Sequence, residues 1–254
     1  MAGLGERFTG KVALVTGAAS GIGRAVSLRL ASEGANVLAF DLNAEGLSET
    51  AALAAGSSGS ITTRTGDVSQ RSECQAAVAD CVDRFGKLDI LGNVAGIGGA
   101  QHFTDVTEEL YRKFMGVNVD GYFWMAQAAI PHLLASSGNI VNLGSISGLT
   151  GQAYNVAYCT TKGAVINLTR ALAAEYVKTP LRVNAICPGG VLTGLTANFS
   201  IPADIDGELM FLYSGFRGMV DPTEIANLFA FLASDEAKNI HGALVPTDGG
   251  ITAS

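Results

Sequence analysis

A tyrosine and a lysine spaced four residues apart, Tyr158 and Lys162, are the pair in this 254-residue sequence best suited to moving a proton. In a helix, residues i and i+4 lie on one face, so the ammonium group would stand beside the phenol. A free tyrosine has a pKa of about 10 and is a poor base at neutral pH, whereas a neighbouring positive charge favours the phenolate. Such pairs also occur in ordinary amphipathic helices, so the spacing by itself leaves catalysis and packing both open.

Ser145 lies 13 residues before Tyr158 and follows an apolar run that predicts a strand. A hydroxyl group in that position could hold a substrate oxygen while Tyr158 transfers the proton. Together with the glycine-rich segment described next, Ser145 makes general acid–base catalysis the favoured interpretation of the Tyr158 and Lys162 pair.

The glycine-rich segment runs Thr16-Gly17-Ala18-Ala19-Ser20-Gly21-Ile22-Gly23, between a first apolar run and a helical pattern. Glycine allows a tight turn and a close approach of backbone to ligand, and a helix N-terminus offers free N–H groups to a phosphate. Asp41 ends the next apolar run, 18 residues after Gly23. A carboxylate there can accept hydrogen bonds from both ribose hydroxyls and repels a 2′-phosphate. We therefore expect a dinucleotide site, with NAD as the cofactor.

The elements that position these residues follow from the alternation of short apolar runs with helical patterns. Runs that are apolar on both faces, separated by helices, are typical of a parallel sheet covered on both sides. We predict one doubly wound α/β domain over residues 1–254, of the Rossmann type. The strands are expected near residues 12–15, 36–40, 60–65, 88–94, 139–143, 181–186 and 243–245. The helices are expected near residues 22–30, 43–55, 72–85, 106–135 with interruptions near Gly116 and Gly121, 156–178 and 223–233.

Composition narrows the class of protein. The chain has 32 glycines, 15% charged residues and a formal net charge of −7, which argues against nucleic-acid and anionic-membrane partners. Residues 121–161 form a run of 41 residues without Asp, Glu, Lys or Arg. Pro131 and repeated glycines interrupt this run, so it does not predict a membrane span. Residues 1–11 lack an apolar core, and we expect neither a signal peptide nor a location outside the cytoplasm.

Histidine and cysteine give no sign of a metal site. The three histidines, His102, His132 and His241, are scattered, and the four cysteines lack Cys-x-x-Cys spacing. We expect no bound metal and four reduced thiols.

Several separated motifs together resemble the short-chain dehydrogenase/reductase family, in its branch of about 250 residues, over essentially the whole chain. They are the Gly-x-x-x-Gly-x-Gly loop, Asp67-Val68, Asn93-Val94-Ala95-Gly96, Tyr158-x-x-x-Lys162, Pro188-Gly189 with Thr193, and Asp248-Gly249-Gly250. The resemblance implies that Asn118, Ser145, Tyr158 and Lys162 are catalytic, with Asn118 supporting a water that leads from Lys162 to solvent. It implies that the cofactor contacts Gly17, Ser20, Gly21, Ile22, Gly23, Asp41, Leu42, Asp67, Val68, Asn93, Ala95, Gly96, Tyr158, Lys162, Pro188, Gly189, Val191 and Thr193.

One residue departs from the family pattern. Val94 replaces the usual second Asn, and we expect a small structural adjustment there without loss of activity. Relatives that use NADP carry a basic residue at one of two positions, which hold Ser20 and Leu42 in this sequence. NAD is therefore the expected cofactor.

Residues 194–220 occupy the place of the family's variable substrate lid, and they hold four of the 18 aromatic residues. The lid carries Asp204, Asp206 and Glu208 against Arg217, a poor match for phosphorylated or thioester-linked carriers. We expect an uncharged secondary alcohol or ketone as substrate. The candidate contacts are Ser147, Gln152, Asn155, Phe199 and Phe211.

Three functions stay open at this point. The first is an NAD-dependent secondary-alcohol dehydrogenase, and the second is a 3-oxoacyl-thioester reductase of the same fold, which Asp41 and the acidic lid disfavour. The third is a catalytically silent NAD-binding regulator, which the complete catalytic set disfavours. The family also packs the helices that flank the neutral run against a second subunit, so we expect a homotetramer or homodimer.

Overall fold

The central feature of the fold is a seven-stranded parallel sheet in the order β3-β2-β1-β4-β5-β6-β7. The computed structural model describes residues 6–197, 201–211, 213 and 215–253. From β1 the chain first adds strands on one side of the sheet, β2 and β3, and then adds β4 to β7 on the other side. The connections after β1 and β4 therefore run to opposite faces and leave a crevice between the carboxyl ends of these two strands. The strands are β1 Val12–Thr16, β2 Asn36–Asp41, β3 Ser60–Thr65, β4 Ile90–Asn93, β5 Asn139–Leu143, β6 Arg182–Pro188 and β7 Leu244–Thr247. The predicted doubly wound parallel sheet is thereby confirmed.

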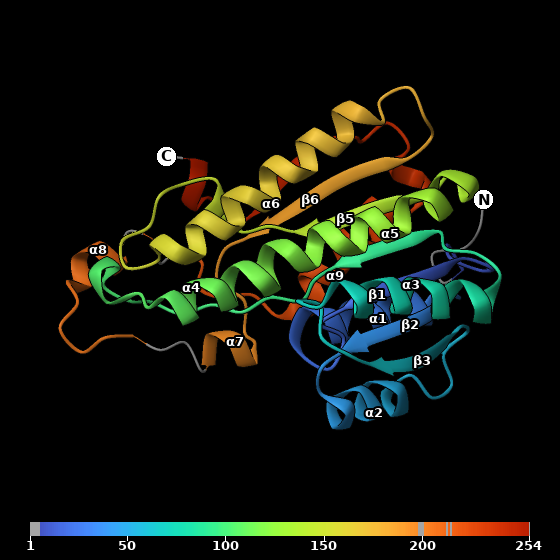
Figure 1. Cartoon of the computed structure of the whole chain (residues 1–254), viewed down its shortest axis with the longest axis horizontal. Helices are drawn as coiled ribbons and strands as arrows, with labels where there is room; N and C mark the ends of the chain where they lie inside the picture. Colours follow the sequence, from blue (N-terminus) through green and yellow to red (C-terminus); the bar gives the residue numbers. More distant parts are fainter. Residues whose placement is uncertain (1–5, 198–200, 212, 214, 254) are drawn as a thin grey trace.

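Helices cover both faces of the sheet, as continuous apolar strands require. In Figure 1, α5 and α6 lie in front of β5 and β6, and α9 lies behind them. The helices are α1 Gly21–Ser32, α2 Ala44–Leu53, α3 Arg71–Phe85, α4 Glu108–Met115, α5 Gly121–Ser136, α6 Val156–Glu175, α7 Gly194–Ala197, α8 Gly207–Phe211 and α9 Pro222–Ala233.

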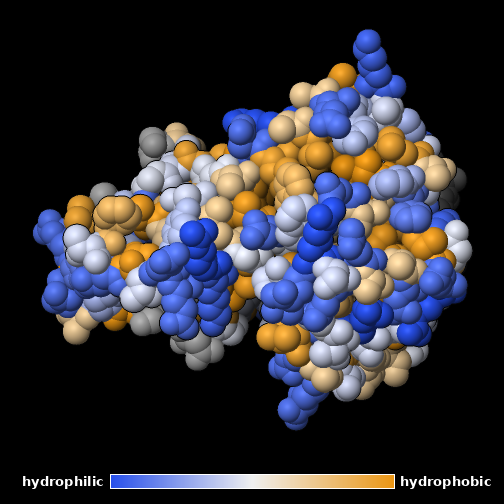
Figure 2. Space-filling view, in the orientation of Figure 1, coloured by the Kyte–Doolittle hydropathy of each residue, from blue (hydrophilic) through white to orange (hydrophobic). Residues whose placement is uncertain are grey.

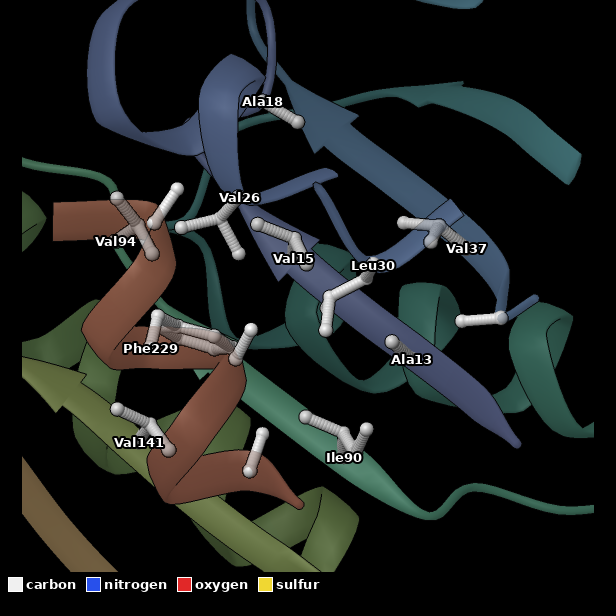
Figure 3. Close-up of a cluster of buried hydrophobic side chains, with 14 of the residues drawn as sticks. Ala13, Val15, Ala18, Val26, Leu30, Val37, Ile90, Val94, Val141 and Phe229 are labelled. Atoms are coloured by element: carbon white, nitrogen blue, oxygen red, sulfur yellow. The ribbon is translucent and has the colours of Figure 1, made fainter. Parts of the chain in front are cut away.

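Each face of the sheet has its own buried core. On one face, Phe229 of α9 and Leu30 of α1 pack against Val15 and Ile90 (Figure 3). On the other face, α3 and α5 pack against Leu14 and its neighbours in β2, β4 and β5. Because both sides are filled, ligands have access to the sheet at the ends of its strands.

The helix expected over residues 106–135 begins two residues later and has no break at its glycines. Residues Gly116–Asp120 instead form a π-helical segment that joins α4 to α5, so the two run on as one long helical element (Figure 1). A π-helical turn accommodates one additional residue and is common near functional sites. The sequence pattern located the irregularity at Gly116 and Gly121, whereas its form depends on packing.

Candidate active site

A cavity of about 750 Å³ lies at the carboxyl ends of the strands, where ligands bind in open α/β sheets. Figure 2 shows the hollow between the part of the chain that carries α4 and α7 and the rest of the molecule. All the predicted cofactor contacts except Asn93 line it, and so does Ser145. Asn93 lies behind the wall, where its amide donates to Asn142 Oδ1 at 3.0 Å between β4 and β5. It therefore supports the site from within the core.

The glycine loop packs so closely that side chains would block it. A Cβ atom on Gly23 would lie 2.1 Å from the Gly17 carbonyl oxygen, and one on Gly17 would lie 2.8 Å from Ala95 Cα. Gly17 also has φ +70°, in the left-handed region that favours glycine. The hydroxyl of Thr16 accepts hydrogen bonds from Val94 N and Ala95 N at 2.9 and 3.0 Å. This cradle at the first turn of α1 fits the pyrophosphate of a dinucleotide.

Val94 has a simple place in this arrangement. Its side chain is buried in the core that includes α1 and α9, while its backbone N–H bonds to Thr16. The apolar residue at this position therefore packs into the core.

Asp41 is held at the end of β2 by two backbone N–H groups. Its Oδ2 accepts from Ala19 N at 3.0 Å and its Oδ1 accepts from Asn43 N at 2.9 Å. The adjacent Leu42 is 71% exposed and carries no charge. The carboxylate is thus fixed at the rim of the cavity, in the position predicted for the ribose contact.

Asn118 lies in the π-helical segment and does not line the cavity. Its Oδ1 accepts from Ile97 N at 2.9 Å, and its Nδ2 donates to Ile97 O at 2.9 Å and to Thr161 Oγ1 at 3.1 Å. These three bonds connect the β4 loop, the long helical element and α6. The predicted water path past Asn118 stays a prediction, whereas the amide group itself joins three elements of the site.

Ser145 begins the short 3-10 turn η3, Ile146–Gly148, after β5. This turn packs against α6 so tightly that a Cβ atom on Gly148 would lie 2.6 Å from the Lys162 carbonyl oxygen. The contact brings the Ser145 hydroxyl to Tyr158, and a hydrogen bond between the two side chains lowers the pKa of the phenol. The predicted pairing of Ser145 with Tyr158 is present in the structure.

Lys162 is 3% exposed, and its ammonium group donates to the Leu143 carbonyl oxygen at 2.8 Å. The same oxygen accepts from the Tyr122 hydroxyl at 3.1 Å. Lys162 Nζ lies 5.8 Å from the centre of the Tyr158 ring. The i, i+4 pair therefore shares one helix face, as predicted, with the ammonium group anchored to the end of β5.

Burial shifts the pKa values of Tyr158 and Lys162 in the directions that disfavour their charged forms. It raises the pKa of Tyr158 to about 12, with the Ser145 hydrogen bond acting in the opposite direction, and it lowers the pKa of Lys162 to about 8. The i, i+4 spacing predicts that the neighbouring ammonium group favours the phenolate and so lowers the tyrosine pKa. In the protein alone the shift is upward because loss of hydration outweighs other contributions.

Known proteins resemble this chain in both sequence and fold. A family model described as enoyl-(acyl carrier protein) reductase matches residues 17–252. Meso-2,3-butanediol dehydrogenase of Serratia marcescens is 37% identical over 98% of this chain and 97% of its own length. 2,5-Dichloro-2,5-cyclohexadiene-1,4-diol dehydrogenase of Sphingobium indicum is 41% identical over 97% of this chain and 98% of its own length. A short-chain dehydrogenase from Mycobacterium paratuberculosis bound to NAD superposes with a TM-score of 0.88, at 31% identity over 98% of this chain and 100% of that chain.

The chain belongs to the short-chain dehydrogenase/reductase family. It is therefore an oxidoreductase. The resemblance seen in the sequence motifs is confirmed over the full length of the fold.

In this family member, three of the predicted substrate contacts lie away from the cavity wall. Ser147 and Asn155 are buried, and Gln152 lies behind Ser145, bonded to Ser147. Phe199 is outside the described residues. Phe211 ends α8, and its backbone position places it in the lid segment predicted for residues 194–220.

The lid segment is attached to the loops around the site by polar contacts. The Tyr213 hydroxyl accepts from Ala153 N at 2.9 Å, and the Tyr154 hydroxyl accepts from Asp206 N at 3.0 Å. His102 Nε2 lies 3.0 Å from Asp204 Oδ1. One predicted acidic lid residue thus pairs with a histidine on the opposite loop.

The cavity wall also contains residues that the motifs did not indicate. Thr196 hydrogen-bonds to the Thr193 hydroxyl and to the Val191 carbonyl oxygen. Its spacing of three residues from the predicted cofactor contact Thr193 could have indicated that it lies in the same wall. Arg112 and Lys113 of α4 also line the wall, and no local pattern predicts that placement. These wall residues include Ser69, Gln70, Arg112, Lys113, Gly116, Val117, Leu195 and Thr196.

Among the described residues, no group of three or more His, Cys, Asp or Glu side chains could hold a metal ion. Within the same part of the chain, no helix combines the length and apolar character needed to cross a bilayer.

Proposed function

We propose that this protein is an NAD-dependent dehydrogenase that interconverts an uncharged secondary alcohol and its ketone, with Tyr158 as general acid–base. One observation carries the proposal. Ser145, Tyr158 and Lys162 line the same cavity as the glycine cradle and Asp41. A substrate oxygen at Ser145 and Tyr158 would therefore lie in the cavity that holds the cofactor.

The residues divide the proton chemistry among them. Ser145 holds the substrate oxygen, and Tyr158 removes the hydroxyl proton in oxidation or supplies it in reduction. Lys162, fixed by the Leu143 carbonyl oxygen, stabilises the phenolate through a low-dielectric medium that screens its charge poorly. When bound, the nicotinamide supplies the hydride acceptor or donor.

Asp41 and Arg24 support NAD over NADP. Fixed by two N–H groups, the Asp41 carboxylate would oppose a 2′-phosphate. Arg24 is the nearby cation that could compensate, yet its guanidinium already donates to Thr50 Oγ1, Glu49 Oε2 and backbone oxygens. Its Nε and Nη2 donors are therefore engaged within the protein, and Glu49 offsets its charge.

The proposed substrate class rests on the charge of the lid. Asp204, Asp206 and Glu208 give this segment an acidic character, unsuited to phosphate-bearing carriers. The two curated relatives described above are named as dehydrogenases of uncharged diols, one of them cyclic. Small neutral diols and cyclic alcohols are accordingly the first substrates to test.

We expect NADH to form when the protein is given NAD and a panel of neutral secondary alcohols, with kcat/KM for NAD at least about 100-fold above that for NADP. Absorbance of the reduced nicotinamide follows both reactions. A preference for NADP would contradict the role of Asp41. Faster turnover of 3-oxoacyl thioesters would select the reductase alternative, and NAD binding without turnover of any substrate would select the silent regulator.

We also propose that α5 and α6 form an interface with a second copy of the chain, within a tetramer or dimer. Apolar residues gather over these two helices (Figure 2). Phe123 is 44% exposed and Val156 is 41% exposed, and the neutral run includes all of α5 and the start of α6. A charge-free apolar surface of this kind suits burial against another subunit.

Light scattering at micromolar concentration is expected to give a mass of two or four 26.1-kDa chains. Phe123→Glu should shift that mass towards the monomer because it introduces a charge into the contact. Leu53→Glu, on the exposed side of α2, is the matched control and should leave the mass unchanged. A monomeric wild-type protein would overturn this proposal.

A further inference from the structure

Two polar side chains behind Ser145 form a hydrogen-bond chain that the reaction above does not use. Ser145 Oγ donates to Ser147 Oγ at 3.1 Å, and Ser147 Oγ donates to Gln152 Oε1 at 2.6 Å. The Ser147 N–H donates in turn to Ser145 Oγ at 3.1 Å. Ser145 and Ser147 are 8% and 6% exposed, so water does not compete freely for these groups.

The orientation of one amide group sets the direction of the whole chain. An amide oxygen can only accept a hydrogen bond and an amide nitrogen can only donate one. With Gln152 Oε1 towards Ser147, Ser147 donates to the amide and can only accept from Ser145, which favours a Ser145 proton turned away from the cavity and a lone pair turned towards it. With the amide turned by half a rotation, Nε2 would donate to Ser147, Ser147 would donate to Ser145, and the Ser145 proton would face the cavity.

The two directions match the two forms of the substrate. An alcohol hydroxyl needs an acceptor, whereas a ketone oxygen or the Tyr158 phenolate needs a donor. We propose that Gln152 is a positioning residue that sets the direction of the Ser145 hydroxyl proton through Ser147, so that one serine serves both alcohol and ketone. The catalytic consequence of this inference rests on the proposed function. The hydrogen-bond chain itself is given by the distances between Ser145, Ser147 and Gln152.

The segment that carries Gln152 is held from several sides. Ala153 N donates to the Tyr213 hydroxyl, and the Gln152 N–H hydrogen-bonds the Cys159 thiol. The Ser145 N–H bonds the Cys187 thiol of β6. The terminal amide of Gln152 can therefore turn while its backbone stays in place. The titratable groups around the Ser145–Ser147–Gln152 hydrogen-bond chain are Tyr122, Tyr158, Cys159, Lys162, Cys187 and Tyr213.

Gln152→Glu tests the proposal because a carboxylate can only accept, which holds the Ser147 proton on residue 152 and leaves Ser147 Oγ as an acceptor for Ser145. Ser147 can then no longer donate to Ser145, so donation from Ser145 to the phenolate is weakened, and we expect the pKa of Tyr158 in the NAD-bound protein to rise by about one unit. The pH profile of alcohol oxidation should move by the same amount towards alkaline pH. Tyrosinate absorbance, taken as the difference from Tyr158→Phe with NAD present, measures the pKa without any substrate.

A second variant separates the hydrogen-bond chain from the new charge. Ser147→Ala combined with Gln152→Glu keeps the charge and cuts the chain, and at least half of the shift should disappear. Ser147→Ala alone, which frees the Ser145 proton, should not raise the pKa of Tyr158. Equal shifts in Gln152→Glu and in the double variant, or no shift in either, would overturn the proposal. A shift in absorbance without turnover by the wild-type protein would instead count against the proposed function alone.

Discussion

Tyr158→Phe is expected to lower kcat by about 10²- to 10⁴-fold, the range that a positioned general acid–base contributes. The substitution keeps the ring that packs beside Lys162 and removes the hydroxyl that bonds to Ser145. The glycine cradle and Asp41 lie on other elements, so the affinity for NAD should stay within about twofold. Steady-state kinetics with the best alcohol of the panel and calorimetric titration with NAD measure the two quantities.

Tyr176→Phe, just beyond the end of α6, is the matched control and should retain full activity. Near-normal turnover by Tyr158→Phe would remove the proposed mechanism. A parallel loss of NAD binding would point instead to a collapse of the cavity, and circular dichroism would then reveal the change in fold.

Lys162→Met should abolish most of the activity and yet stabilise the protein. Burial lowers the pKa of Lys162 from 10.5 to about 8, which corresponds to a cost of about 3 kcal/mol for the charged form in the folded state. Methionine removes that cost but leaves the Leu143 carbonyl oxygen without its ammonium partner, at about 1–3 kcal/mol. We expect a net gain of about 1 kcal/mol in the free energy of unfolding at pH 7.

The pH dependence identifies the cause of that gain. Between pH 8 and 10.5 the unfolded chain holds a proton on Lys162 that the folded chain has released, so wild-type stability from this group rises with pH. The advantage of Lys162→Met should therefore shrink above pH 8, by about 1.4 kcal/mol per pH unit, and reverse near pH 9. Urea unfolding at pH 7 and pH 10 measures it, with the exposed Lys178→Met as control. A gain independent of pH would contradict the assignment to the buried charge.

Much of the cofactor site was predictable because its determinants are local in the chain. Tight turns need glycine at Gly17 and Gly23 whatever the surroundings, and Asp41 follows directly from the end of a strand. The i, i+4 spacing of Tyr158 and Lys162 likewise fixes a shared helix face. Each of these residues lies where the pattern predicted.

Other features depend on contacts between distant segments, which spacing does not reveal. The upward shift in the pKa of Tyr158 arises from burial by several elements, so the i, i+4 pair alone suggested the opposite sign. Ser147 and Gln152 were predicted beside the substrate, yet they lie behind Ser145 because η3 folds back against α6. The lid helices α7 and α8 lack a strong periodic pattern and were expected only as a segment.

The π-helical segment at Gly116–Asp120 has a consequence for how the molecule could change in evolution. One inserted residue turns everything after it by about 100° around the helix axis. Arg112 and Lys113 before the segment face the cavity, and Phe123 after it faces outwards. Loss of a single residue there would rotate α5 relative to α4, so that the cavity residues and the exposed residues could no longer both keep their places. A helix with these two roles therefore tolerates substitutions along its length far better than deletions.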